Sequence, residues 1–148
     1  MTQTEVRVGV ACFVFYNDSE GSSYVLLGQR KGSHGSGTWQ LPGGHLEMFE
    51  SFEICAKREV FEESNIDLRN EIRFLTATNN IMGEKHYVTI FMCSEISSKE
   101  AENVRVMEPH KLEGEWKWVT LEELKQNYKP KFSPLQSFID NHDLSFLK

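Results

Sequence analysis

Residues 44–66 read GHLEMFESFEICAKREVFEESNI, and this stretch decides how the rest of the 148-residue chain is interpreted. Its centre, residues 58–63, is Arg-Glu-Val-Phe-Glu-Glu. Residues three and four apart share a face of a helix, so Glu59, Glu62 and Glu63 are expected to project from one side within about one turn. Three carboxylates this close repel one another unless a cation lies among them. The stretch therefore predicts a site for a hard divalent cation, Mg²⁺ or Mn²⁺.

The predicted cation also indicates a class of substrate. In proteins Mg²⁺ commonly binds through one or two carboxylates together with substrate phosphates. The simpler interpretation is a solvated surface helix, because glutamate pairs are common on protein surfaces. Against it, the turn sequence Leu-Pro-Gly-Gly at residues 41–44 leads directly into the acidic segment, and the helix has apolar residues on its other faces. These apolar residues, which must be packed, are Phe52, Cys55, Val60 and Phe61.

Residues 44–66 resemble the signature motif of the Nudix hydrolases. That motif has Gly, five residues, Glu, seven residues, Arg-Glu, an aliphatic residue, any residue, Glu-Glu, any residue, Gly and an aliphatic residue. Its fixed positions fall on Gly44, Glu50, Arg58, Glu59, Val60, Glu62, Glu63, Asn65 and Ile66. Asn65 replaces the family's second Gly, and Asn is the next most tolerant residue at a left-handed helix end. Phe49 stands where many relatives carry Gly, so the shape of the loop before the helix is left open.

The resemblance implies a fold, an activity and a set of metal ligands. The fold is α/β, an α/β/α sandwich with a mixed β-sheet, here as one domain over residues 1–148. The activity is hydrolysis of a nucleoside diphosphate linked to a further group. The implied metal ligands are Glu59, Glu62, Glu63 and the backbone carbonyl of Gly43 or Gly44.

Two further features are predicted for the site: an ion pair and a general base. Arg58 and Glu50 are expected to pair and so to fix the helix against the loop before it. Glu59 or Glu63 can take the proton of the attacking water, so the identity of the general base stays open. Two acids of a later loop are alternative bases: Glu108 and Glu113.

Flanking segments extend the resemblance to the MutT-type nucleoside triphosphate diphosphatases. Residues 28–47 read GQRKGSHGSGTWQLPGGHLE, residues 86–89 read HYVT, and residues 107–118 read MEPHKLEGEWKW. These segments are most similar to the MutT-homologue-2 group and its plant cytosolic relatives. By this resemblance, Arg30 approaches the substrate phosphates. The other implied substrate contacts are Gln40, Leu41, Gly43, Gly44, Thr89 and Phe132.

The expected reaction is Mg²⁺-dependent hydrolysis of nucleoside or deoxynucleoside triphosphates to a nucleoside monophosphate and pyrophosphate. Purine nucleotides are favoured, with oxidised ones such as 8-oxo-dGTP among the candidates. One alternative is a hydrolase of ADP-ribose or of another nucleoside diphosphate derivative. An alternative of another class is a non-catalytic, nucleotide-binding Nudix module. Such a module would be expected to lose acids of the motif, and this chain keeps the complete set.

Net charge, cysteine content and the lengths of apolar runs limit the expected binding partners and cellular location. The net charge of −6 argues against a binder of duplex nucleic acid, which would carry a basic face. The three cysteines, Cys12, Cys55 and Cys93, lie in apolar stretches and read as buried free thiols of a reducing compartment. No apolar run has the length of a membrane span, and no signal peptide is visible. We therefore expect a cytoplasmic protein, and the resemblance suggests a homodimer.

The order of predicted elements alternates strands and helices. Strands are expected at residues 6–16, 24–30, 39–41, 71–78, 87–95 and 115–119. Helices are expected at residues 51–64, from 120 onward, and at 134–141, with Ser51 as the first N-cap and a capping box at residues 120–123. Loops are expected at residues 31–37 and 97–113, and a Pro-Gly-Gly turn at residues 42–44. Strands before and after a helix favour a mixed sheet covered on both faces.

Overall fold

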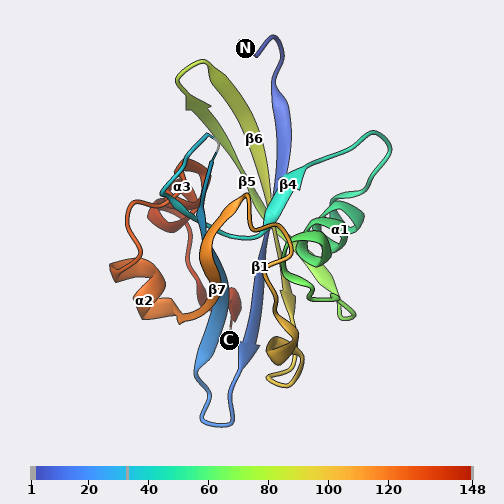
Figure 1. The fold of residues 1–148 in the computed structure, drawn as a ribbon, viewed down its shortest axis with the longest axis vertical. Helices are drawn as coiled ribbons and strands as arrows, with labels where there is room; N and C mark the ends of the chain where they lie inside the picture. The colour runs from blue at the N-terminus through green and yellow to red at the C-terminus, as the bar shows by residue number, and fades with distance from the viewer. Residues whose placement is uncertain (1–2, 33, 148) are drawn as a thin grey trace.

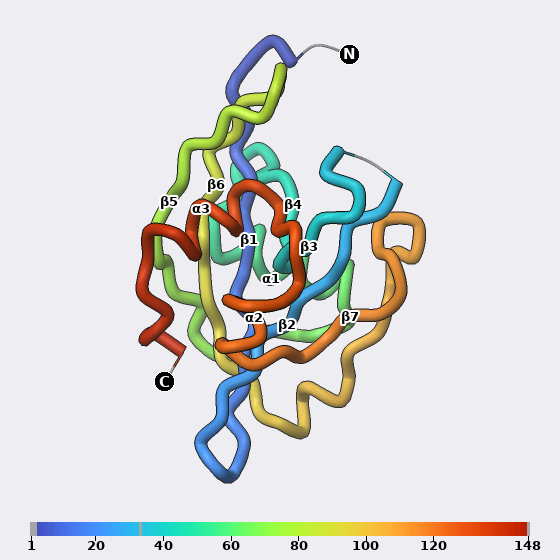
Figure 2. The backbone as a smooth tube through the Cα atoms, turned by 90° about the vertical axis from the view of Figure 1, so that its left-hand side faces the viewer, coloured from blue at the N-terminus to red at the C-terminus, as the bar shows by residue number. Residues whose placement is uncertain are grey.

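The computed structural model describes residues 3–32 and 34–147. In these residues a mixed β-sheet lies between two layers of helix (Figure 1). Helix α1 (Phe52–Ser64) covers one face of the sheet, and α2 (Leu121–Gln126) and α3 (Ser133–Asn141) cover the other. Figure 2 shows the same arrangement from the side of α2 and α3, which lie in front of the strands. The predicted α/β fold with a mixed sheet is confirmed.

The sheet is organised around β1. Its strands are β1 (Arg7–Asn17), β2 (Ser23–Arg30), β3 (Trp39–Gln40), β4 (Gly43–His45), β5 (Ile72–Met82), β6 (Lys85–Glu95) and β7 (Leu112–Thr120). Strand β1 pairs antiparallel with β2 and β4, and parallel with β6. Strand β2 also pairs antiparallel with β3 and with β7, and β6 pairs antiparallel with β5 at the far edge of the sheet. The parallel pairing of β1 with β6 makes the sheet mixed.

Alternation along β1 builds one core on each face of the sheet. Val10, Cys12 and Val14 pack with the buried residues of α1. Phe13 and Phe15, which point to the opposite face, pack with the buried residues of α2 and α3. A strand buried on both faces has this pattern because successive side chains point to opposite sides. The two cores hold α1 and α3 at fixed positions on either side of β1.

The predicted signals at helix ends are confirmed. The Ser51 side chain accepts a hydrogen bond from the Ile54 backbone N–H at 3.1 Å. At the other end of α1, Asn65 has the left-handed conformation, with φ 66°. Thr120 and Glu123 form the reciprocal capping box of α2. These local signals were sufficient because each depends on residues within one turn of the helix end.

Three predictions about local structure are corrected. The expected turn at residues 42–44 contributes β4, because a strand needs only a backbone partner and β1 supplies one. A side chain at Gly43 would overlap the backbone of Val10, so glycine permits this close pairing. The expected loop at residues 97–113 contains a 3-10 helix, η1 (Glu100–Asn103), and β7 begins at Leu112. Phe61, expected to be packed, is 49% exposed.

The three cysteines are buried and free, as predicted. Burial raises the pKa of the Cys55 thiol to about 12, which leaves it protonated at neutral pH. A second short 3-10 helix, η2 (Ser145–Leu147), ends the described chain and was not predicted. None of the helices in the described ranges is long and apolar enough to cross a bilayer.

Candidate active site

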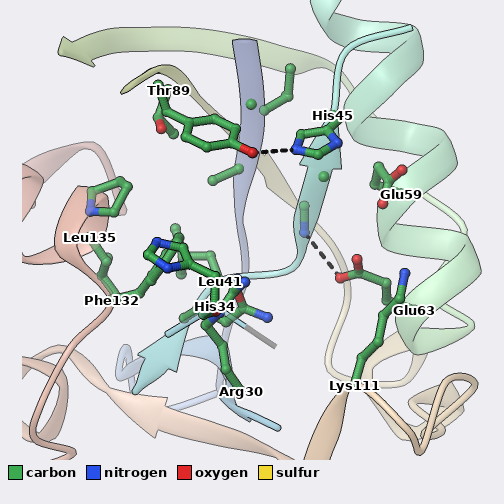
Figure 3. A pocket seen from close by; sticks show the side chains of 18 of the residues that line it. Arg30, His34, Leu41, His45, Glu59, Glu63, Thr89, Lys111, Phe132 and Leu135 are labelled. Atoms are coloured by element: carbon green, nitrogen blue, oxygen red, sulfur yellow. Dashed lines mark hydrogen bonds between the residues drawn. The ribbon is translucent and has the colours of Figure 1, made fainter. Parts of the chain in front are cut away.

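A cavity of about 1050 Å³ lies over β1, between α1 and the segment that leads into α3. Its two ends differ in chemistry (Figure 3). We call the part that contains Glu59 and Glu63 the acidic end, and the part that contains Leu41, Phe132 and Leu135 the apolar end. The same cavity can therefore contact a charged group and an aromatic or apolar group at once.

The acidic end depends on close contact between α1 and β4. The Gly43 backbone N–H donates to Oε1 of Glu63 at 3.1 Å. A side chain at Gly44 would overlap the Glu59 carboxylate, so the glycine allows α1 to approach. Burial raises the pKa of Glu63 well above its usual range, and the neighbouring Glu59 carboxylate raises it further. A cation beside both carboxylates would relieve this cost, so the hard oxygen donors here fit Mg²⁺ or Mn²⁺.

Glu62 pairs with Arg58, which also contacts Glu59. Oε1 of Glu62 lies 3.2 Å from Nη1 of Arg58, one helical turn earlier, and the Glu62 side chain is 50% exposed. Helix geometry turns Glu62 and Glu63 about 100° from each other, to either side of Glu59. In the described part of the chain, no three acidic, histidine or cysteine side chains converge on one point. The three carboxylates thus share one side of α1, about 100° wide, and do not meet at a single point in the structure.

Arg58 and Glu50 form the expected ion pair. The guanidinium donates from Nε to Oε2 at 2.6 Å and from Nη2 to Oε1 at 2.9 Å. These hydrogen bonds lower the pKa of Glu50 to about 2. Nη1 of the same arginine donates to Glu59 at 2.6 Å. Arg58 thus ties the loop before α1 to a carboxylate of the acidic end.

Phe49, immediately before Glu50, has an unusual backbone. Its φ is 69°, in the left-handed region that favours glycine, and the residue is 99% exposed. This is the position where relatives often carry Gly, and the structure keeps the glycine-like conformation with a bulky residue. A left-handed conformation is costly for an aromatic residue, so the loop is locally strained.

Arg30 organises the apolar end. Its guanidinium carbon lies 4.0 Å from the centre of the Phe132 ring. Nε donates to the His34 backbone carbonyl at 2.8 Å, and Nη1 donates to the Gln40 side chain. A side chain at Gly35 would overlap the Phe132 ring. The contacts of Arg30 therefore hold the loop after β2 against the residue that precedes α3.

The other predicted residues lie around the same cavity. Leu41 is buried, and Thr89 on β6 is 7% exposed. Glu108 lines the cavity and lies 3.5 Å from Nζ of Lys111. Glu113, the other predicted loop acid, lies on β7 and does not line it. The structure thus brings Glu108, and not Glu113, to the site.

Sequence reasoning missed several residues of the cavity wall. Tyr87 lies two residues before Thr89 on β6, so period-two alternation could have placed it on the same face. Trp116 also lines the cavity, and its indole N–H donates to the Glu63 backbone carbonyl at 3.0 Å. Arg7 and Leu135 carried no sequence signal, because only the pairing of distant segments brings them to the cavity.

Comparison with known proteins identifies the class. The NUDIX domain family matches residues 5–140, so the chain belongs to the Nudix family and is a hydrolase. A MutT NUDIX hydrolase from Burkholderia pseudomallei is similar with a TM-score of 0.75 and 26% identity, covering 94% of this chain and 99% of that one. The family and this neighbour agree with a hydrolase of the Nudix/MutT type.

Two further structures share the fold. The NUDIX domain of Shewanella oneidensis NrtR, complexed with ADP ribose, has a TM-score of 0.73 and 22% identity, covering 91% of this chain and 85% of that one. An Ap4A hydrolase from C. elegans, in a binary complex, has a TM-score of 0.69 and 19% identity, covering 90% of this chain and 93% of that one. Related folds therefore accompany different nucleotide ligands.

Proposed function

We propose that this Nudix hydrolase cleaves nucleoside triphosphates with the help of Mg²⁺, or of Mn²⁺, into nucleoside monophosphate and pyrophosphate. The favoured substrates are purine nucleotides and deoxynucleotides, with oxidised purines among the candidates. One observation carries the proposal: a single cavity joins a carboxylate pair, Glu59 and Glu63, to a wall that contains the Phe132 ring. A nucleotide has the matching order, with phosphates at one end and a planar base at the other.

The acidic end would bind the cation and the phosphates. Glu59 and Glu63 would hold the metal, together with Glu62 after it leaves Arg58, and with the carbonyl of Gly43. The bound metal would neutralise phosphate charge and lower the pKa of an attacking water. Arg58 keeps the Glu59 carboxylate in place through its hydrogen bond.

The general base is proposed from the acids that line the cavity. Glu59 or Glu63 would accept the proton of the attacking water. Glu108 is the alternative base, supported by its place in the cavity wall. Glu50 acts through Arg58 and has no direct contact with the reacting atoms in this proposal.

The apolar end would receive the base. Phe132 offers a ring for stacking, while Leu41 and Thr89 lie beside it in the cavity wall. Gln40 is held by Arg30, so its amide is positioned for hydrogen bonding. Arg30 is proposed to approach the phosphates, and its contacts with Phe132 and Gln40 support a further role in holding the base pocket.

The test is a nucleotide panel with Mg²⁺ in ¹⁸O-water, in which phosphate and pyrophosphate are measured separately. We expect pyrophosphate as the primary product, and the product that carries ¹⁸O locates the attacked phosphorus. Orthophosphate as the first product would contradict the proposal. Strong preference for ADP-ribose would favour the alternative class of nucleoside diphosphate derivatives. Tight nucleotide binding without turnover would favour a non-catalytic module.

Three finer statements belong to the same proposal. A reducing compartment such as the cytoplasm is supported by three buried thiols, none of which is in a disulfide within the described residues. A nucleotide, and not duplex nucleic acid, is the proposed partner, supported by the net charge of −6. A homodimer is supported by the resemblance to the MutT-homologue-2 group, and light scattering would test it.

A further inference from the structure

Tyr87 and His45 meet at the mouth of the cavity, where β6 and β4 lie on either side of β1. Nε2 of His45 lies 3.0 Å from the Tyr87 hydroxyl oxygen, and this contact is drawn as a dashed line in Figure 3. The two rings are nearly parallel, with an interplanar angle of 11°. On the other side of the imidazole, Nδ1 lies 3.2 Å from Nη2 of Arg7. The three side chains therefore form a chain of contacts that ends at the cavity.

The chemistry of arginine fixes the direction of this chain. A guanidinium can only donate hydrogen bonds, so Nδ1 of His45 must accept and carries no proton. The neutral imidazole then carries its proton on Nε2 and donates it to the Tyr87 oxygen. Because that oxygen accepts from His45, the proton of Tyr87 must point in another direction. In residues 3–32 and 34–147, the Tyr87 hydroxyl has no hydrogen-bond partner other than His45.

The neighbours of Tyr87 and His45 indicate that this hydroxyl lies between the two ends of the cavity. Tyr87 shares a face of β6 with Thr89, which lies near the apolar end. His45 follows Gly44, whose backbone contacts the Glu59 carboxylate. Figure 3 shows His45 between Thr89 and Glu59. In a nucleotide that spans both ends, the group between the base and the phosphates is the sugar.

On this basis, and building on the proposed function, we propose that Tyr87 donates its hydroxyl proton to a hydroxyl oxygen of the nucleotide sugar. His45 and Arg7 are positioning residues, which act by fixing the direction of that donor. Tyr87 would thus recognise the sugar, a part of the substrate that neither Phe132 nor the carboxylates contact. The contact is a single partly exposed hydrogen bond, so its expected contribution to affinity is modest.

The test combines a change in the protein with a change in the sugar. Dissociation constants of GMP, dGMP and 2′,3′-dideoxy-GMP are measured by calorimetry for the wild type and for Tyr87→Phe. We expect Tyr87→Phe to weaken GMP binding by roughly three- to tenfold, the range for one hydrogen bond. If Tyr87 donates to the 2′-hydroxyl, only GMP binding weakens; if it donates to the 3′-hydroxyl, binding of GMP and of dGMP weakens. Dideoxy-GMP lacks both sugar hydroxyls, so its affinity should be unchanged by the substitution.

Two outcomes would overturn the inference. One is an equal loss for all three nucleotides, which would place the donor elsewhere, and the other is no loss for any of them. Tyr24→Phe removes a hydroxyl that contacts Asp18 on the β1–β2 hairpin, and it serves as the matched control. Turnover of GTP and dGTP by the wild type is measured in parallel. Absence of turnover would refute the proposed function while the binding cycle still decides the role of Tyr87.

Substitutions of His45 test the positioning role separately. Glutamine places an amide N–H near the position of Nε2, so His45→Gln should retain most of the affinity for GMP. Asparagine reaches only to the position of Nδ1, so His45→Asn should weaken GMP binding as Tyr87→Phe does, and should leave dideoxy-GMP unaffected. Equal affinities for the Gln and Asn variants would show that His45 does not orient the tyrosine.

Discussion

The two ends of the cavity are built in different ways. The acidic end comes from one continuous run of chain, β4 and α1, in which Glu59 and Glu63 meet Gly43 and Gly44. Besides Leu41, which lies just before β4, the apolar end is assembled from segments far apart in the sequence: the end of β2, strand β6 and the residues around the start of α3. The proposed metal-binding part is therefore fixed by local sequence, whereas the part proposed to contact the base depends on tertiary packing. We therefore expect substitutions at the apolar end to change substrate choice without altering the acidic end.

The strongest test of this division is Glu63→Gln, which removes one carboxylate charge and keeps the size of the side chain. We expect turnover to fall by roughly a thousandfold, because a ligand charge at the transition state is lost. The melting temperature should stay the same or rise slightly, since a neutral amide avoids the cost that raises the pKa of Glu63. Steady-state kinetics at saturating Mg²⁺ measure the loss of turnover, and thermal melting measures the change in stability. Glu53→Gln, on an exposed position of α1, is the control. Near-normal turnover of the Glu63 variant would remove Glu63 from the metal site.

Phe132→Ala tests the apolar end. Loss of the ring should raise KM by about tenfold, the size expected for one aromatic stacking contact. The kcat should change by less than about threefold, because the acidic end is untouched. Phe74→Ala removes a ring that is 55% exposed on the edge strand β5 and should leave both constants unchanged. A fall in kcat as deep as that of Glu63→Gln would show that the two ends do not act separately.

Glu50→Gln tests how the acidic end is held. At pH 7 the variant should be less stable by about 2 kcal/mol, the scale of hydrogen bonds to a charged group. Arg58 depresses the pKa of Glu50 from 4.5 to about 2, so the stabilisation is present above pH 4.5 and is lost as the pH falls towards 2. The difference in unfolding free energy between wild type and variant should therefore shrink over that interval, as measured by urea denaturation.

Glu71→Gln is the control for this pH series. Glu71 lies 3.9 Å from Arg73, and its side chain is 81% exposed, so its loss should have no measurable effect on stability. A difference for Glu50→Gln that stays constant down to pH 2 would show that the ion pair is not the source of the stabilisation.

The smallest effects are expected at the end of α1, outside both ends of the cavity. Asn65→Gly keeps the left-handed cap but loses the side-chain hydrogen bond to the Asn103 carbonyl, so its stability should stay within about 0.5 kcal/mol of wild type. Asn65→Val should cost about 1 kcal/mol or more, since a β-branched residue resists positive φ. Melting temperatures check the order, and equal values for the two variants would refute the cap.

The sequence was most informative where structure depends on near neighbours. Helix α1, its Ser51 cap and its Asn65 end could all be predicted, because each signal lies within one turn of the feature it specifies. Strand β4 could not, since two glycines after a proline indicate a turn unless a partner strand is known. Its partner β1 lies more than thirty positions earlier: Gly9 pairs with His45.

The candidate site shows the same limit. The motif pointed to Glu59, Glu62 and Glu63, but the spacing alone does not show that Arg58 pairs with Glu62 and leaves its side chain half exposed. The role expected for Arg30 depended on resemblance, and only the structure shows its contact with Phe132. Residues that meet through the pairing of distant strands leave no local pattern to recognise.

The parallel pairing of β1 with β6 has a consequence for synthesis on the ribosome. Arg7 pairs with Tyr87 and Gly9 with Thr89, so the central strand lacks this neighbour until eighty more residues have been added. The acidic segment emerges long before that, and Phe132 emerges later still. Distant contacts form only after the intervening chain is available, and domains generally fold as units. We therefore expect a nascent chain that already displays its glutamates to be unable to consume cellular nucleotides, and activity to begin only when translation of the domain is nearly complete.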